Sequence, residues 1–86
     1  MSEEDNIEYH MITGTTSFYK KTVKYKSFTT EWYALRFGKG KHAKIILDSY
    51  AVLDDGEKRR IQAVDLHVEQ LPEYIQFLEH VQEDSL

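Results

Sequence analysis

The stretch SFYKKTVKYKSF, residues 17–28, places four lysines and four aromatic residues in twelve positions of a chain whose net charge is −4. Side chains of an extended strand alternate between its two faces, so every second residue of this stretch shares a surface. Ammonium groups neutralise phosphates and aromatic rings stack on nucleobases, a combination that holds single-stranded nucleic acids. The alternation therefore predicts a nucleic-acid-binding face that consists of Phe18, Lys20, Lys24, Lys26 and Phe28.

The same pattern has an ordinary structural interpretation. Lysines on strands face solvent and protect sheet edges from aggregation, and aromatic residues are among the best strand formers. The stretch taken alone leaves both interpretations open.

The ionisable residues are segregated along the chain. Residues 1–18 carry four acids and no base, residues 19–44 carry eight bases against Glu31 alone, and residues 45–86 carry three bases and ten acids. Such segregation can give an acidic protein a basic face, and a polyanion responds to the local field more than to the total charge. The negative net charge therefore does not exclude a nucleic-acid ligand.

The elements that must position these residues follow from periodicity and turn signals. Residues 1–14 begin with acids and predict a flexible tail, and residues 15–86 are short enough for only one domain. Glycines at 38, 40 and 56 supply the tight turns that separate alternating patterns. These patterns predict four antiparallel strands, namely the stretch above and residues of about 31–37, 42–53 and 58–66.

A helix is predicted to follow the strands and to complete an α+β fold. The segment VEQLPEYIQFLEHVQ, residues 68–82, places apolar residues at helical spacing, and Pro72 falls in its first turn, where no N–H is needed. The rings of Tyr74 and Phe77 lie off the main apolar stripe of the helix. They widen its apolar surface beyond what one small sheet can cover, which favours a homodimer. The alternative is that both rings pack at the margin of the sheet. The predicted dimer interface consists of Tyr74, Phe77, Leu78 and Val81.

Residues that would support catalysis or metal binding are sparse. Cysteine is absent and the four histidines are widely dispersed. Asp54 and Asp55 precede Gly56, where aspartates typically form turns. No phosphate-binding loop or nucleophile elbow occurs, so we expect no enzyme activity, no metal and no cofactor. We also expect an intracellular protein, in cytoplasm or nucleus and without a membrane partner, because no apolar run approaches the roughly 18 residues of a membrane span.

From about Trp32 onward, the chain resembles the single-stranded DNA-binding domain of the positive-cofactor-four family of transcriptional coactivators. The resemblance is carried by WYALRFGKGKHAKIILDSY, an aromatic strand with a basic turn and a second strand, and by DDGEKRRIQAVDLHVEQLPEYIQFLEHV, an acidic turn with basic residues, a strand and the helix. It covers roughly the last 50 residues and implies a curved four-stranded sheet, dimers formed through the helices, and single strands held on the sheet. The contacts implied by position are Trp32, Tyr33, Arg36, Lys39, Lys41, Lys44, Tyr50, Arg59 and Arg60.

Two functions are consistent with this sequence. The first is a non-enzymatic single-stranded DNA-binding protein of low sequence specificity, acting in transcription, replication or recombination, for which RNA is also a possible ligand. Its affinity is expected to fall steeply with salt as lysines release counterions. The alternative is a small protein-binding module, an inhibitor or adaptor, that uses its helix or sheet surface.

Overall fold

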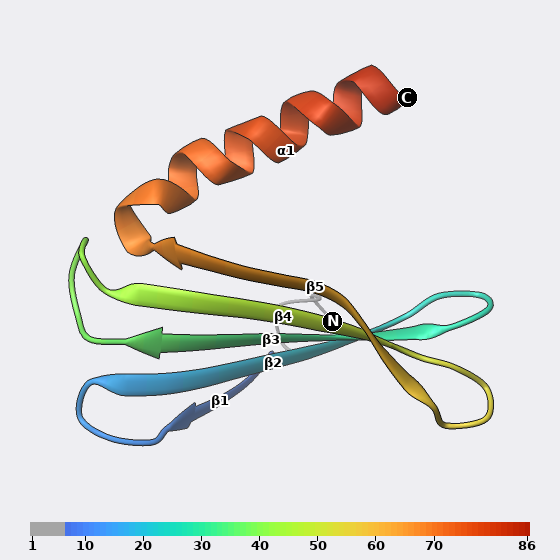
Figure 1. Ribbon diagram of the computed structural model, residues 1–86, viewed down its shortest axis with the longest axis horizontal. Helices are drawn as coiled ribbons and strands as arrows, with labels where there is room; N and C mark the ends of the chain where they lie inside the picture. Colours follow the sequence, from blue (N-terminus) through green and yellow to red (C-terminus); the bar gives the residue numbers. More distant parts are fainter. Residues whose placement is uncertain (1–6) are drawn as a thin grey trace.

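The chain forms one antiparallel sheet and a C-terminal helix in a computed structural model that describes residues 7–86 (Figure 1). The strands lie in the order of the sequence, β1-β2-β3-β4-β5. This architecture confirms the predicted α+β class. The elements are β1 (Ile7–Met11), β2 (Thr16–Lys24), β3 (Thr29–Phe37), β4 (Lys44–Val52), β5 (Lys58–His67), a short 3-10 helix (Val68–Gln70) and α1 (Leu71–Ser85).

The sheet has five strands rather than the predicted four. The extra strand, β1, falls within the segment predicted to be a flexible tail, of which residues 1–6 lie outside the described part. β1 pairs with β2 from Ile7 opposite Lys21 to Met11 opposite Ser17. The connection is a tight turn in which Thr13 Oγ1 accepts hydrogen bonds from the backbone N–H groups of Thr15 and Thr16. All five residues of β1 are exposed, so the strand buries little apolar surface, although Ile7, Tyr9 and Met11 alternate with Glu8 and His10 as in a strand.

The strand β2 ends at Lys24, earlier than the lysine and aromatic pattern predicts. Residues 25–28 form the turn to β3, closed by a 2.8 Å hydrogen bond from the Tyr25 N–H to the Phe28 carbonyl. The rings of Tyr25 and Phe28 stack with centroids 4.9 Å apart. The prediction that Lys26 and Phe28 continue the strand is therefore wrong, because the chain reverses direction there.

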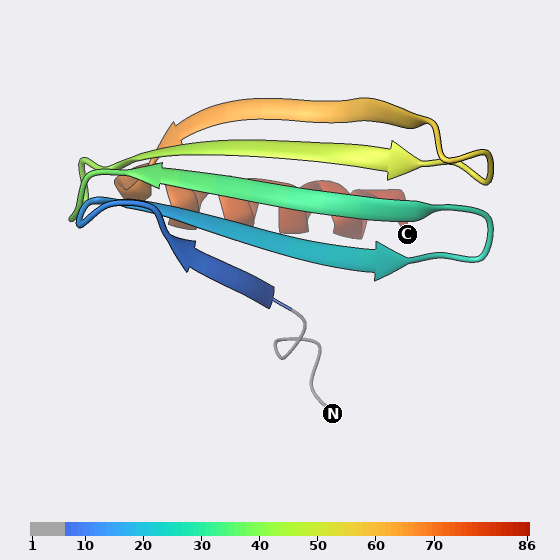
Figure 2. The same ribbon diagram turned by 90° about the horizontal axis from the view of Figure 1, so that it is seen from below.

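Paired residues of neighbouring antiparallel strands share a face, so the register divides the sheet residues into two sets. The open face includes the row Phe18, Leu35 and Ile46, which lie opposite one another in β2, β3 and β4. The helix face carries the alternate residues of each strand and faces α1, which lies behind the sheet when the open face is viewed (Figure 2). The strand residues that are buried all belong to the helix face: Ser17, Thr30, Ile45 and Ser49.

A bulge in β5 changes which residues reach each face. Tyr50 pairs with Arg60, whereas the preceding Ser49 pairs with Gln62, so Ile61 is an extra residue on β5. Because the extra residue shifts the alternation by one, Arg60 lies on the open face and Gln62 on the helix face. Gln62 Nε2 there donates a 2.9 Å hydrogen bond to the hydroxyl of Tyr74 in α1.

The helix α1 is fixed to the sheet mainly through its N-terminal connection. The backbone N–H groups of Val68 and Glu69 donate to the carbonyls of Ala43 and Lys41, at 2.9 and 3.0 Å. Pro72 lies in the first turn of α1, as predicted. Within residues 7–86, no helix combines the length and the apolar character that crossing a membrane requires.

Candidate functional site

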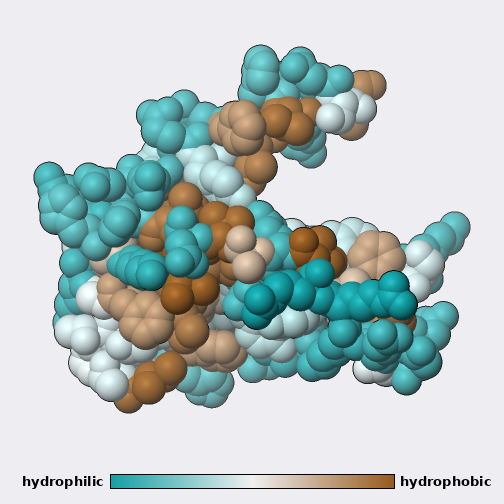
Figure 3. Space-filling view, in the orientation of Figure 1, coloured by the Kyte–Doolittle hydropathy of each residue, from teal (hydrophilic) through white to brown (hydrophobic). Residues whose placement is uncertain are grey.

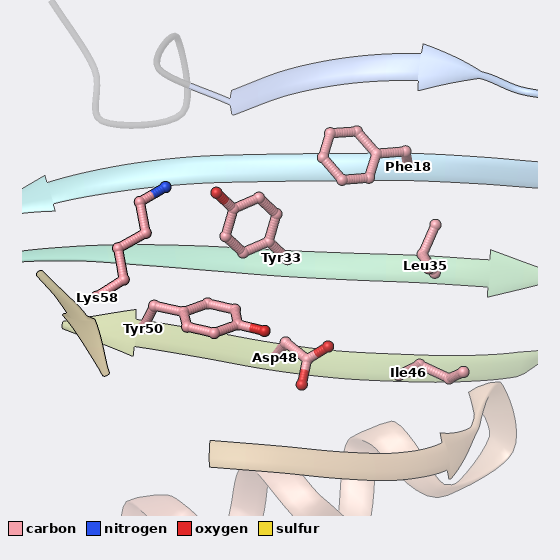
Figure 4. A pocket seen from close by; sticks show the side chains of 7 residues that line it. All are labelled: Phe18, Tyr33, Leu35, Ile46, Asp48, Tyr50 and Lys58. Carbon is pink, nitrogen blue, oxygen red and sulfur yellow. The ribbon is translucent and has the colours of Figure 1, made fainter. Parts of the chain in front are cut away.

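A series of aromatic side chains crosses the open face from β1 to β4. Ring centroids are separated by 6.0 Å between His10 and Phe18, 5.9 Å between Phe18 and Tyr33, and 5.8 Å between Tyr33 and Tyr50. Each ring comes from a different strand, so the pairing of the strands sets the spacing. We call Phe18, Tyr33 and Tyr50 the aromatic row. Figure 4 shows these three rings side by side on adjacent strands.

The aromatic row borders a cavity of about 360 Å³ in the open face. This volume is at the lower end of the roughly 300–1,000 Å³ typical of small-molecule sites. Apolar side chains form most of its wall, and a carboxylate and an ammonium group complete it (Figure 4). The lining residues are Phe18, Tyr33, Leu35, Ile46, Asp48, Tyr50 and Lys58.

Glu31 organises two lysines beside the aromatic row. Its carboxylate lies 2.9 Å from Lys58 Nζ and 3.5 Å from Lys20 Nζ, and accepts a 3.1 Å hydrogen bond from the Tyr33 hydroxyl. The hydrogen bond from Lys58 holds the pKa of Glu31 below its usual range, and the same contact raises the pKa of Lys58. The Glu31 side chain is 13% exposed and that of Lys58 is 54% exposed. The acid is thus covered while a cation remains accessible to a ligand.

Cations also lie against two of the rings. Lys20 Nζ is 5.6 Å from the centroid of Tyr33, and the Arg60 guanidinium is 5.7 Å from that of Tyr50. Arg60 also donates a 3.1 Å hydrogen bond to the Tyr50 hydroxyl. Such cation–π contacts contribute about 0.5–1 kcal/mol at exposed sites. They hold both cations beside the rings of the aromatic row.

The open face as a whole is close to electrically balanced. By register it carries five cations and four carboxylates. Lys44, for example, pairs with Asp65 at 3.5 Å near one end of the sheet. The cations are Lys20, Lys24, Lys44, Lys58 and Arg60, and the carboxylates are Glu8, Glu31, Asp48 and Asp65.

The structure divides the residues that the sequence assigned to nucleic-acid binding. It brings seven of them together on the open face. Trp32, Arg36 and Arg59 lie on the helix face, because each is adjacent in a strand to a residue of the open face. The seven residues on the open face are Phe18, Lys20, Lys24, Tyr33, Lys44, Tyr50 and Arg60.

The other four predicted residues lie in or at the end of turns, and Arg36 on the helix face has a structural contact. Lys26 and Phe28 belong to the β2–β3 turn or its end, and Lys39 and Lys41 to the β3–β4 connection. The half-buried Arg36 donates a 2.9 Å hydrogen bond to the buried Ser17 hydroxyl, so its guanidinium stabilises the sheet.

Sequence reasoning missed three charged residues of the open face that line the cavity or lie beside the aromatic row. Glu31 and Asp48 hold the cations in place, and Lys58 lines the cavity. A signal for Lys58 was present, since it precedes Arg60 by two positions and therefore shares its face. The adjacent pair Arg59 and Arg60 obscured this alternation.

A second, larger hollow lies between α1 and the helix face. Its volume is about 600 Å³, and the space-filling view shows an open notch with apolar side chains beside it (Figure 3). Large apolar side chains are left exposed there, with Trp32 44% exposed and Ile75 52% exposed. We call it the helix groove. Its apolar and aromatic lining residues are Ile7, Tyr19, Trp32, Tyr33, Ala34, Leu47, Leu71, Tyr74, Ile75 and Leu78.

The predicted dimer interface is only partly in this groove. Tyr74 and Leu78 line it, whereas Phe77 and Val81 do not. Phe77 is 62% exposed and Val81 is also exposed. The apolar surface of α1 is therefore wider than the part that faces the sheet.

No family model, curated protein or solved structure matches this chain. In the part of the chain from Ile7 onward, no group of three or more histidine, aspartate or glutamate side chains is placed to hold a metal ion. The assignment of function therefore depends on the geometry of the open face and of the helix groove.

Proposed function

We propose that this protein binds single-stranded DNA on the open face, without enzymatic activity and with low overall sequence specificity. The observation that carries the proposal is the aromatic row, a set of three rings from three adjacent strands flanked by exposed cations. Rings in this arrangement offer stacking surfaces that are worth about 1–3 kcal/mol per base. The resemblance to the positive-cofactor-four domain favours the same ligand, in transcription, replication or recombination.

The spacing of the rings favours a single strand over a duplex. Neighbouring centroids in the row are 5.8–5.9 Å apart, whereas bases along one strand of B-DNA rise by about 3.4 Å. A strand that places one base against each ring must therefore be stretched and unstacked. Bases in a duplex are paired and stacked on one another, so they cannot reach the rings in this way.

The charge balance of the open face indicates how the binding energy is divided. Five cations face four carboxylates, so few phosphates are neutralised without competition from the protein's own acids. Stacking then supplies most of the affinity. We accordingly expect a moderate dependence on salt rather than the steep dependence that the lysine-rich stretch suggests.

The helix groove supports the further proposal of a homodimer. Apolar side chains of α1 and the sheet remain exposed around a hollow of about 600 Å³, and exposed apolar patches of this kind typically mark interfaces. A second copy that inserts its own α1 would cover them. The open faces of both copies would stay accessible, because the groove lies on the opposite side of the sheet.

A titration with a fluorescently labelled single strand of mixed sequence tests the main proposal. A 20-nucleotide strand and the matching duplex should be compared at several salt concentrations by anisotropy. We expect saturable binding that favours the single strand and a modest salt slope. Equal affinity for strand and duplex would contradict the role of the rings.

The helix groove also favours the second candidate function, a protein-binding module. In that case the groove would receive an apolar segment of another protein. A protein that binds neither strand nor duplex and sediments as a monomer would support this function instead of the first.

A further inference from the structure

Asp48 is an acidic residue in the centre of the surface that we propose to bind bases. Its carboxylate lines the cavity of the open face, beside Tyr50 and next to Tyr33 across the strand pair (Figure 4). The side chain is 26% exposed. A carboxylate would repel a phosphate, so its presence among stacking rings needs a different explanation from that of the lysines.

The carboxylate of Asp48 has unused capacity for hydrogen bonds. Its contact with a charged group is the ion pair with Arg60, whose Nε lies 3.6 Å from Oδ1. That guanidinium is also engaged with the Tyr50 hydroxyl. Among residues 7–86, the Asp48 carboxylate has this ion pair as its charged contact and accepts no side-chain hydrogen bond. An ionised carboxylate accepts up to about four hydrogen bonds, so Asp48 can receive donors from a ligand.

The edges of the four DNA bases differ in what they offer to a carboxylate. Guanine presents two adjacent donors, N1–H and the N2 amino group, which match the two oxygens. Cytosine and adenine each present one amino group beside a ring nitrogen that accepts. Thymine presents one N–H between two carbonyl oxygens, which a carboxylate repels. Single-stranded bases leave these edges free to be recognised.

We infer that the cavity seats one guanine base, with its N1–H and N2 amino group donating to Asp48 and its ring against the aromatic row. This inference rests on the proposed function, and it adds a preference at one position to an otherwise tolerant surface. Lys58 lines the same cavity and supplies donors of the kind that guanine O6 and N7 accept. A bidentate contact of this kind discriminates between bases by about 5- to 150-fold.

The test compares 12-nucleotide thymidine strands that differ at one central position. The central base is thymine, guanine, cytosine or hypoxanthine, which is guanine without the N2 amino group. We expect the guanine strand to bind about 5- to 150-fold more tightly than the thymine strand, with hypoxanthine between them. Equal binding of the guanine and thymine strands would overturn the guanine site while leaving the proposed function intact.

Two variants assign the preference to Asp48. Asp48→Asn should bind the thymine strand more tightly than the unchanged protein does, because it removes a carboxylate that repels thymine and phosphate oxygens, and it should lose the preference for guanine. Asp65→Asn is the matched control, because it removes one negative charge from the same face, where Asp65 pairs with Lys44 outside the cavity. It should keep the preference. Retention of the preference in Asp48→Asn, with circular dichroism unchanged, would overturn the assignment, and failure of every strand to bind would overturn both proposals.

Discussion

Replacing Tyr33 by leucine removes the central ring of the aromatic row and keeps an apolar side chain in the strand. Tyr33 has neighbouring rings on both sides, Phe18 at 5.9 Å and Tyr50 at 5.8 Å, and Lys20 lies near it. The variant should therefore lose one complete stack. A stack is worth about 1–3 kcal/mol, so the dissociation constant for a single strand should rise about 5- to 150-fold.

The neighbouring residue provides a matched control. Trp32 precedes Tyr33 in β3 but faces the helix groove, so Trp32→Leu removes a larger ring from the opposite side of the same strand. This variant should leave the affinity for a single strand unchanged. A second control, Tyr33→Phe, keeps the ring and removes the hydroxyl that donates to Glu31. It should lower the free energy of unfolding by about 1 kcal/mol with little effect on binding.

Fluorescence anisotropy with a mixed-sequence 12-nucleotide strand measures the affinities, and urea unfolding followed by circular dichroism measures the stabilities. The two measurements separate a lost contact from a damaged fold. If Trp32→Leu and Tyr33→Leu weaken binding equally while both remain folded, the assignment of the ligand to the open face is refuted.

Three further predictions concern charge, pH and assembly. Lys58→Gln should weaken single-strand binding and reduce the magnitude of the salt slope by about 0.7, whereas Lys39→Gln, in a turn away from the cavity, should leave the slope unchanged. The contacts that lower the pKa of Glu31 stabilise the fold at pH values above its ordinary pKa of 4.5, and this contribution is lost as the pH falls through the folded-state pKa. Urea unfolding below pH 4.5 should therefore show a steeper loss of stability in the unchanged protein than in Glu31→Gln. Leu78→Asp places a charge in the helix groove and should convert a dimer into a monomer in sedimentation velocity experiments, with single-strand binding per chain retained. A dimer that persists in Leu78→Asp would exclude the groove as the interface.

Much of the fold could be predicted because its signals are local. The glycine turns and the alternation in β3 and β4 lie within short stretches, and Gly38 and Gly56 indeed adopt positive φ angles of 88° and 86°. The helix is equally visible from its apolar spacing and from Pro72. Each of these signals depends on a few neighbouring residues, which a single sequence contains.

The features that could not be predicted depend on partners distant in the chain. β1 shows the alternation of a strand over only five residues, all of them exposed, and it forms because β2 offers it hydrogen-bonding groups. The extra residue Ile61 is evident only from the pairing of β5 with β4. Because that bulge reverses the alternation after it, no reading of β5 by itself could place both Arg60 and Gln62 on the correct faces.

The composition of the open face also depends on pairing between segments that are distant in the chain. Lysines and rings in residues 17–28 are conspicuous, but only the register shows that Tyr33 and Tyr50 continue the row from Phe18. The acids that balance the lysines were harder still to anticipate. Glu31 lies in a different strand from both Lys20 and Lys58, so its role appears only when three strands are assembled.

The order of the strands has a consequence for how the protein folds. Every strand of the sheet pairs only with strands adjacent to it in the sequence, so each pairing closes a short loop at a small cost in entropy. Topologies with such local contacts fold quickly. The aromatic row needs only β2, β3 and β4, so the three rings are assembled once two consecutive hairpins have formed, before α1 has to reach its place behind the sheet.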